Sequence, residues 1–418
     1  MDRQQRNKPL NRPLVAALAL IAFGAVSVTL GQAPGTPAPV ATVPGMPPVI
    51  DAKNLYSEIA AGKIAPAIAN DLPRVYVPHV KSNDVYVIDP ATMQVVDRFK
   101  VGINPQHVVP SWDMRTLWVA NNAEGRKDGS LTPIDPTTGK PGKAIPVDDP
   151  YNVYASPDGK SLIIVAEAYK RLDFRDPRTL VMQARIPTPR CSGVNHADFS
   201  IDGRFAIFTC EFEGTVAKID LVERKVLGYL QLIKPGKPTK VVKGFDGRDE
   251  TICASWKGMP QDIRISPDGK LFFVADMMSD GVYVVDGETF RQVDFIPTGV
   301  GTHGLYPSRD GRKLYIANRG SNKISGPPKG KGSISVLDFA SRKVETTWPI
   351  PGGGSPDMGN VSADGKTLWL AGRYDDVVYA IDTGNGNVTT IAVGKEPHGL
   401  TVWPQPGRYS LGHTGNMR

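Results

Sequence analysis

The histidines are the residues of this sequence whose type and spacing point most clearly to chemistry. The chain has six, and four of them occupy one recurring motif, at His107, His196, His303 and His398. Imidazole titrates near neutral pH and is the commonest protein ligand of transition metals. Histidines at matching positions of a repeat predict one shared site for a metal ion or a small ligand.

Other donor groups fall near the same positions. The candidate acids or bases are Glu167, Glu211 and Asp262, and the further candidate ligands are Asp357, His413, Cys191, Cys210 and Cys253. Imidazole with carboxylate and occasional thiolate suits copper or another transition metal. No HExxH or CxxC motif specifies a metal. The alternative that these histidines only bond neighbouring backbone carbonyls therefore stays open.

The motif belongs to a sequence repeat that must position these side chains. Its seven copies start at Pro105, Pro150, Val194, Pro260, Thr302, Pro356 and Pro397, at intervals of 41 to 66 residues. Such a period indicates an array of repeated structural units. Short apolar runs bounded by turn residues predict strands within each unit. An Asp that ends the third strand of each unit suits a tight turn, and we interpret these Asp residues as structural.

The number of predicted strands favours a closed ring. Each unit supplies four strands, but residues 74–101 supply only three, and the missing innermost strand is the last of the chain, His398 to Trp403. Sharing one unit between the two ends removes exposed strand edges. We predict an all-β fold, a seven-bladed β-propeller of four-stranded antiparallel blades, over residues 74–404.

This topology predicts where the histidines meet. In an antiparallel blade the innermost strand begins on the face where the second strand ends, so the four motif histidines should surround one mouth of the channel. His79 ends a second strand and should join them. His107 and His196 stand one residue later in the motif than His303 and His398. The two pairs should therefore point differently, and a single pair could line the channel.

The N-terminal region predicts export. Residues 1–31 combine a basic head with an uncharged apolar run, which is typical of a signal peptide or an uncleaved anchor. Residues 32–50 form a Pro-rich linker, and residues 51–73 allow short helical turns before the propeller. We expect a periplasmic or secreted protein that meets a membrane only through its N-terminal segment, if that segment is uncleaved.

The cysteines and the insertions add two further hypotheses. The chain has three cysteines, and we expect two of them to form a disulfide, with a thiolate metal ligand as the alternative for the third. The first long insertion carries Lys234, Lys237, Lys240 and Lys243, which could attract an anion or nucleic acid. The first 31 residues hold +3 of the net charge of +7, so the positive charge left on the rest of the chain is modest. We therefore favour solvated loops over a nucleic-acid-binding groove for these insertions.

The repeats resemble a known family. The units THGLYPSRDGRK, LYIANRGSNKI and SISVLDFASRKV are similar to the YVTN-type repeats of YncE-like exported bacterial propellers. The resemblance covers residue 74 to the end, and it implies the propeller fold and an extracytoplasmic location. It implies little about activity, because propellers serve many functions.

Three functions are compatible with these observations. The first is an extracytoplasmic scaffold that binds a metal, a small ligand or a protein partner at the His-rich mouth. The second is a copper-dependent oxidoreductase, similar in arrangement to nitrous oxide reductase and thiocyanate dehydrogenase. The third is a DNA- or anion-binding propeller, and the modest charge makes a nucleic-acid partner the weaker hypothesis.

Overall fold

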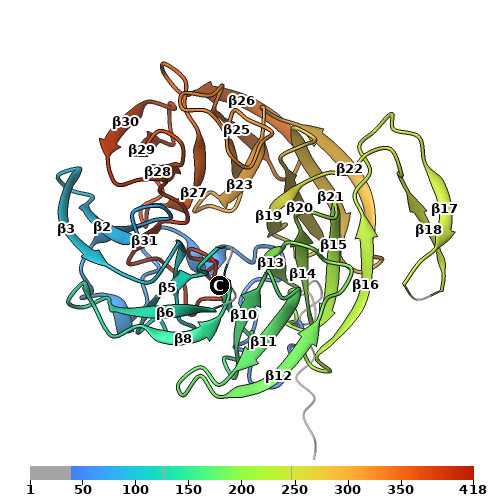
Figure 1. Cartoon of the computed structure of the whole chain (residues 1–418), viewed down its shortest axis with the longest axis horizontal. Coiled ribbons are helices and arrows are strands. Elements are labelled where there is room, and N and C mark those ends of the chain that lie inside the picture. The colour runs from blue at the N-terminus through green and yellow to red at the C-terminus, as the bar shows by residue number, and fades with distance from the viewer. Residues whose placement is uncertain (1–38, 125, 127, 246) are drawn as a thin grey trace, which may run out of the picture. The chain divides into compact units, whose positions relative to one another are not determined.

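The computed structural model describes residues 39–418 except 125, 127 and 246. Seven antiparallel sheets stand around a ring in the described part of the chain (Figure 1). Six sheets have four strands, and in the seventh the outer strand is divided in two. The predicted seven-bladed β-propeller is confirmed. The predicted signal peptide or anchor (1–31) and residues 32–38 of the predicted linker lie outside the described residues.

The strands occupy four positions from the channel outwards. The innermost strands are β4 (Pro105–Pro110), β9 (Pro150–Ala155), β13 (Val194–Phe199), β19 (Pro260–Ile265), β23 (Thr302–Pro307), β27 (Pro356–Val361) and β31 (Thr401–Trp403). The second strands are β5 (Leu117–Asn121), β10 (Leu162–Ala166), β14 (Phe205–Cys210), β20 (Leu271–Asp276), β24 (Lys313–Asn318), β28 (Thr367–Gly372) and β1 (Arg74–His79).

The outer strands follow in the same order. The third strands are β6 (Asp128–Asp135), β11 (Arg171–Arg175), β15 (Thr215–Asp220), β21 (Gly281–Asp286), β25 (Ser333–Asp338), β29 (Val377–Asp382) and β2 (Asp84–Asp89). The fourth strands are β7 (Lys140–Pro141) with β8 (Ile145–Asp148), β12 (Met182–Pro187), β16 (Lys225–Gln231), β22 (Arg291–Pro297), β26 (Lys343–Pro349), β30 (Val388–Ala392) and β3 (Gln94–Lys100).

Burial explains the order of the strands. The innermost strands are buried almost throughout, whereas the fourth strands alternate between exposed and partly buried side chains. A strand covered on both faces needs a continuous apolar run, while an outer strand with one solvated face alternates. The core therefore lies between the faces of neighbouring blades.

Local hydrogen bonds explain two sequence signals. Each third-strand Asp accepts hydrogen bonds from backbone amides two or three residues later, as Asp89 does from Ala91 and Asp338 from Ser341. In the Ser–Asp turns between first and second strands, the serine hydroxyl donates to the aspartate, as Ser156 does to Asp158 at 2.6 Å. These carboxylates shape turns, as the sequence predicts.

The two ends of the propeller region share one sheet, whose strand order is β3–β2–β1–β31. Strand β31 pairs antiparallel with β1, with Val402 opposite Val75.

The predicted C-terminal tail (405–418) is mostly buried and turns back along β9. The Ala155 amide donates to the Leu411 carbonyl at 3.0 Å, and the His413 amide donates to the Val153 carbonyl at 3.1 Å. Gly412 has φ +104°, and a Cβ there would collide with the Val153 carbonyl. In Figure 1 the C-terminus lies near the middle of the ring.

Two short segments complete the fold. The region before β1 contains the 3-10 helices η1 (Ser57–Ile59) and η2 (Pro66–Ile68). The long insertion after β16 forms a hairpin of β17 (Lys240–Lys243) and β18 (Asp249–Ile252), which projects from the ring in Figure 1. No helix in the described residues is long and apolar enough to cross a membrane.

Candidate metal and ligand site

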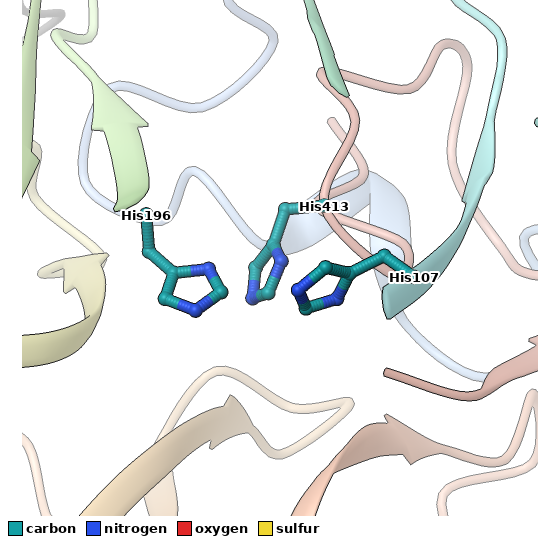
Figure 2. Close-up of side chains that lie close together, drawn as sticks. All are labelled: His107, His196 and His413. Atoms are coloured by element: carbon teal, nitrogen blue, oxygen red, sulfur yellow. The ribbon is translucent and has the colours of Figure 1, made fainter. Parts of the chain in front are cut away.

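Five of the six imidazoles form one buried cluster. The ring centroid of His107 lies 4.7 Å from that of His398 and 5.3 Å from those of His196 and His413. His196 and His413 are 4.3 Å apart, and His303 lies 6.3 Å from His398. Figure 2 shows His413 between His107 and His196. All five side chains are at most 2% exposed.

The innermost strands that carry the motif histidines have irregular starts. The pairing of β4 with β5 shifts between Pro105 and His107, and that of β23 with β24 shifts between Thr302 and Gly304. A bulge re-aims the side chains around it. His107 and His303 stand one residue apart in the motif, yet both belong to the cluster, so the expectation that a single pair could line the channel does not describe this arrangement.

The cluster contains two groups that could each hold a metal ion. One consists of His107, His196 and His413, and the other of His303, Asp357 and His398. Within each group one donor atom from every residue lies within 4.8 Å of the others. Imidazole nitrogen suits copper and zinc, and three imidazoles are a known set for zinc.

Several ring nitrogens in the cluster have no hydrogen-bond partner among the described residues. This holds for both nitrogens of His107 and for Nε2 of His196. His398 Nδ1 lies 3.0 Å from the Gln106 carbonyl, which can only accept, so Nδ1 carries the proton and Nε2 presents its lone pair. A second-shell bond of this kind commonly orients a metal-bound histidine.

Asn152 bridges two of the rings. Its Nδ2 lies 3.1 Å from His196 Nδ1 and 2.9 Å from His413 Nδ1, and the Val153 amide donates to its Oδ1. The amide therefore donates to both imidazoles. A metal ion bound at Nε2 of either ring would require the proton on Nδ1. The side chain of residue 152 would then have to accept a hydrogen bond from Nδ1–H, whereas the amide nitrogen of Asn152 donates one.

Burial keeps the cluster uncharged. Desolvation lowers the pKa of His107, His196, His398 and His413 well below 6.5, and it also lowers the pKa of His303. Metal binding requires the neutral imidazole. The five rings are therefore uncharged at neutral pH.

Asp357 adds a carboxylate beside two cationic side chains. Its Oδ1 lies 2.9 Å from His303 Nδ1 and its Oδ2 lies 3.4 Å from His398 Nε2. Arg319 Nε and Arg373 Nη1 lie 3.6 and 3.7 Å from its oxygens. Burial opposes ionisation of Asp357, but the contact with His303 and the Arg319 guanidinium lower its pKa well below the usual range.

The three predicted acid–base residues have different surroundings. Glu211 accepts hydrogen bonds from Asn195 (2.9 Å) and Gln261 (3.1 Å), and burial raises its pKa. Burial and the Glu211 charge raise the pKa of Glu167 well above its usual range. Asp262 accepts from the Ile263 and Leu305 amides and pairs with Arg264 at 2.9 Å, which are the contacts of a structural carboxylate between blades. Its Oδ1 also lies 3.3 Å from His413 Nε2.

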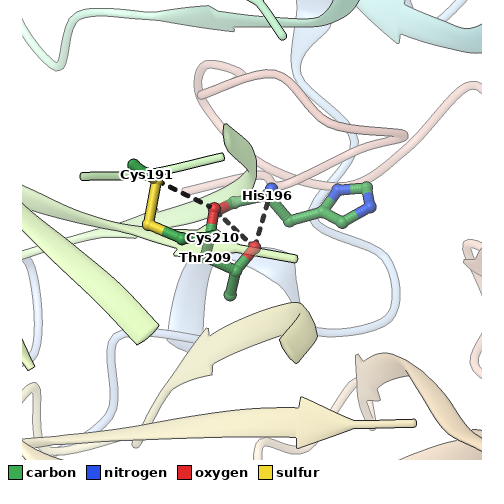
Figure 3. The surroundings of a disulfide bond; sticks show 4 residues. All are labelled: Cys191, His196, Thr209 and Cys210. Atoms are coloured by element: carbon green, nitrogen blue, oxygen red, sulfur yellow. Dashed lines mark hydrogen bonds between the residues drawn. A yellow bond between two sulfur atoms is a disulfide. The ribbon is translucent and has the colours of Figure 1, made fainter. Parts of the chain in front are cut away.

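Some predicted site residues lie outside the cluster. His79 accepts at Nε2 from the Gly394 amide at 3.0 Å, and its Nδ1 lies 3.3 Å from the Asp84 side chain, so it is not brought to the other rings. Cys191 and Cys210 form a disulfide, which makes neither sulfur a free thiolate (Figure 3). Cys253 is a buried free thiol near Ser255 and belongs to neither metal-compatible group.

The sequence reading missed Asn152 as a bridge and the two arginines at the cluster. Arg319 and Arg373 each follow the end of a second strand, the same place that Glu167 and Glu211 occupy in their blades. This shared position was a signal that could have found them.

The lysines of the insertion are partly engaged with other groups. Lys234 and Lys237 lie over the Trp256 ring at 5.3 and 4.7 Å, and Lys243 pairs with Asp249 at 2.7 Å. Lys240 is exposed on β17. Their predicted role in binding an anion or a partner stays a prediction.

Comparisons with known proteins agree with this architecture. A family model described as a YNCE-like beta-propeller matches residues 250–406, and one described as Lactonase, 7-bladed beta-propeller, matches residues 152–326. The chain is 22% identical over 320 residues to the uncharacterized protein YncE of Salmonella typhi, covering 70% of this chain and 75% of that protein.

Solved structures with the same fold include the periplasmic gluconolactonase PpgL of Pseudomonas aeruginosa. Its TM-score is 0.59 at 19% identity, covering 80% of this chain and 99% of that one. Hydrazine synthase of Kuenenia stuttgartiensis has a TM-score of 0.52 at 17% identity, covering 70% of this chain and 87% of that one. At these identities the likeness shows the fold alone. The chain is therefore a seven-bladed β-propeller, and parts of it are similar to the YNCE-like and Lactonase family models.

Proposed function

We propose that this propeller is an extracytoplasmic binding scaffold that holds a transition-metal ion, copper or zinc, among the imidazoles of His107, His196 and His413. The observation that carries the proposal is the set of buried ring nitrogens without partners in this group. An unpaired buried polar atom costs about 1–3 kcal/mol of stability. A metal ion would satisfy several such atoms at once.

The surroundings support the imidazole group over the group that contains Asp357. Two guanidinium groups already lie within 4.0 Å of the Asp357 carboxylate, and their positive charge would repel a second cation. The guanidinium group near His413 belongs to Arg264, which pairs with Asp262 at 2.9 Å, and His413 itself faces the Asp262 carboxylate at 3.3 Å.

Metal retention tests the proposal directly. Protein stripped with a chelator is mixed with Cu²⁺ or Zn²⁺ and passed through a desalting column, and the eluted protein is analysed for metal. We expect about one ion per chain in the wild type and loss of retention in the double variant His107→Ala and His196→Ala. His79→Gln is the matched control, because His79 is a buried histidine outside the cluster. Circular dichroism confirms that each variant is folded.

Asn152→Asp gives an independent arm of the same test. A carboxylate at this position accepts from Nδ1–H of His196 and His413, which is the tautomer that leaves Nε2 for the metal. We expect metal affinity to rise about tenfold. A wild type that elutes free of metal, or a double His variant that retains as much as the wild type, would overturn the proposal.

A copper-dependent redox reaction at the same site is the second candidate. The Tyr151 ring lies 5.5 Å from His107 and 5.9 Å from His196, so a phenol borders the imidazole group. Reversible reduction of the bound Cu²⁺ by ascorbate, followed by electron paramagnetic resonance, would favour this candidate over a purely structural ion. Loss of copper on reduction would count against it.

Extracytoplasmic location forms part of the proposal. The basic and apolar start of the sequence favours export, and the Cys191–Cys210 disulfide suits an oxidising compartment. A similar solved structure carries the description of a periplasmic gluconolactonase. Cell fractionation with a periplasmic marker tests the location.

A further inference from the structure

The residue that follows each second strand forms a ring of side chains with an unequal distribution of charge. Around the blades this position holds Asn122, Glu167, Glu211, Met277, Arg319, Arg373 and Val80. The two acids follow β10 and β14, and the two arginines follow β24 and β28. Strand β28 lies across the ring from β10 and β14 in Figure 1.

The two arginines differ in how well they are held. Arg319 donates to the Met277 sulfur at 3.4 Å, the Ile324 carbonyl at 3.2 Å and the Tyr374 hydroxyl. The Arg373 guanidinium makes no hydrogen bond within the described part of the chain. Its nearest carboxylate oxygen, on Asp357, is 3.7 Å away, and its Nε has no partner. Arg373 is nevertheless largely buried, with 13% of its side chain exposed.

Charge is also unbalanced around Asp357. This one carboxylate faces both guanidinium groups, at 3.6 Å from Arg319 and 3.7 Å from Arg373. Among the described residues, no other carboxylate lies within 4.0 Å of either guanidinium group. A desolvated cation of this kind is costly unless it meets an anion.

We propose that Arg373 binds a small oxyanion, such as the carboxylate of a small organic acid, at the edge of the imidazole cluster. The planar guanidinium offers paired N–H donors that match an oxyanion in a bidentate geometry. Arg319 adds positive charge from the neighbouring blade. The ligand is thereby held with its anionic end at Arg373, next to His303 and His398.

This inference deepens the proposed function, since it assigns a ligand class to the same end of the channel. Its test uses metal-free protein, so the two proposals can fail separately. Binding of lactate, sulfate and the neutral analogue lactamide is measured by calorimetry in a buffer of low chloride content. We expect lactate and sulfate to bind and lactamide not to bind, because only the first two carry an oxyanion.

Substitutions locate the binding site. We expect Arg373→Gln to weaken lactate and sulfate binding at least about tenfold. Arg373→Lys should retain part of the affinity, because Lys keeps the positive charge but lacks the paired planar donors of the guanidinium group. The matched control is Arg115→Gln, which removes the same charge from an exposed turn. A higher affinity for sulfate than for lactate would identify an inorganic oxyanion as the ligand, and the reverse order would identify a carboxylate.

Two outcomes overturn the inference. One is the absence of lactate and sulfate binding by the wild type at any soluble concentration, and the other is equal binding by Arg373→Gln and Arg115→Gln. The metal content of Arg373→Gln should equal that of the wild type, and the double variant at His107 and His196 should still bind lactate. A wild type that retains no metal but binds lactate therefore refutes only the metal site.

Discussion

Histidine shows at the residue scale how environment decides the role of a side chain. His79 and His107 are both fully buried, but His79 has a bond to each ring nitrogen and His107 has none among the described residues. A satisfied imidazole stabilises the blade that contains it, whereas an unsatisfied one is available to a ligand. Both residue type and burial are shared, so only the hydrogen-bond partners separate the two roles.

His79 predicts an acid-dependent loss of stability. Burial lowers its pKa from 6.5 to about 4, although the neighbouring Asp84 opposes the shift. The unfolded chain takes up a proton as the pH falls below 6.5, while the folded chain remains neutral until the pH nears about 4. The stability is therefore complete above pH 6.5 and declines by about 3 kcal/mol on acidification.

Urea unfolding of the wild type and His79→Gln at neutral and acidic pH measures this effect. The other buried histidines act in the same direction in both proteins, so the difference between the two isolates His79. We expect the wild type to lose more stability than His79→Gln on acidification. A difference that does not change with pH would contradict the assignment.

The disulfide illustrates the element scale. Cys191 precedes β13 and Cys210 ends β14, so the bond fastens the two strands that carry His196 and lead to Glu211. Thr209 adds a second link, since its hydroxyl accepts from the His196 amide at 3.0 Å and lies 3.2 Å from the His196 carbonyl (Figure 3). The blade thus holds one imidazole of the cluster with little freedom.

Removing the disulfide should weaken this blade. The double variant Cys191→Ser and Cys210→Ser is expected to lower the free energy of unfolding by about 3 kcal/mol, because the unfolded chain regains the freedom of the closed loop. Cys253→Ser is the control, since Cys253 forms no disulfide. Thermal denaturation with and without reductant gives the comparison. Equal unfolding of the two variants would show that the bond contributes little.

The C-terminal tail connects distant parts of the ring at the scale of the whole molecule. It contributes His413 to the cluster and places Arg418 Nη2 2.7 Å from Asp198 Oδ1, a contact across 220 residues of sequence. Both side chains are buried, at 6% and 0% exposed. Nucleic-acid binding by the basic insertion stays a prediction at this scale, and a steep salt dependence of oligonucleotide binding would support it.

Arg418→Gln tests how firmly the tail is anchored. Breaking one side of a buried ion pair leaves a buried charge, so we expect a loss of about 3 kcal/mol in the free energy of unfolding. Arg408→Gln in the same tail is the matched control. Arg408 is 31% exposed and 3.9 Å from Glu58, so its loss should cost less than about 1 kcal/mol. Similar denaturant midpoints for the two variants would mean that Arg418 does not anchor the tail.

The sequence alone determined the architecture, since the returning motif and its strand patterns predict seven blades and four of the five clustered imidazoles. These signals are local, because turn chemistry and strand period are written in a few consecutive residues. The tail histidine was only an additional candidate, and His79 was expected at the cluster on topology. A strand pattern in the sequence does not predict whether the side chain of His413 or that of His79 reaches the cluster.

Only the tertiary structure decided which side chains meet. His107 and His303 reach one cluster although they stand one residue apart in the motif, and the turn of the tail at Gly412 inserts His413 between its neighbours. Arg373, Arg319 and Asp357 come from two different blades, so their spacing in the sequence does not predict that their side chains lie together. Side-chain direction and charge balance depend on all packed neighbours at once, and for that reason the site became visible only after the ring was assembled.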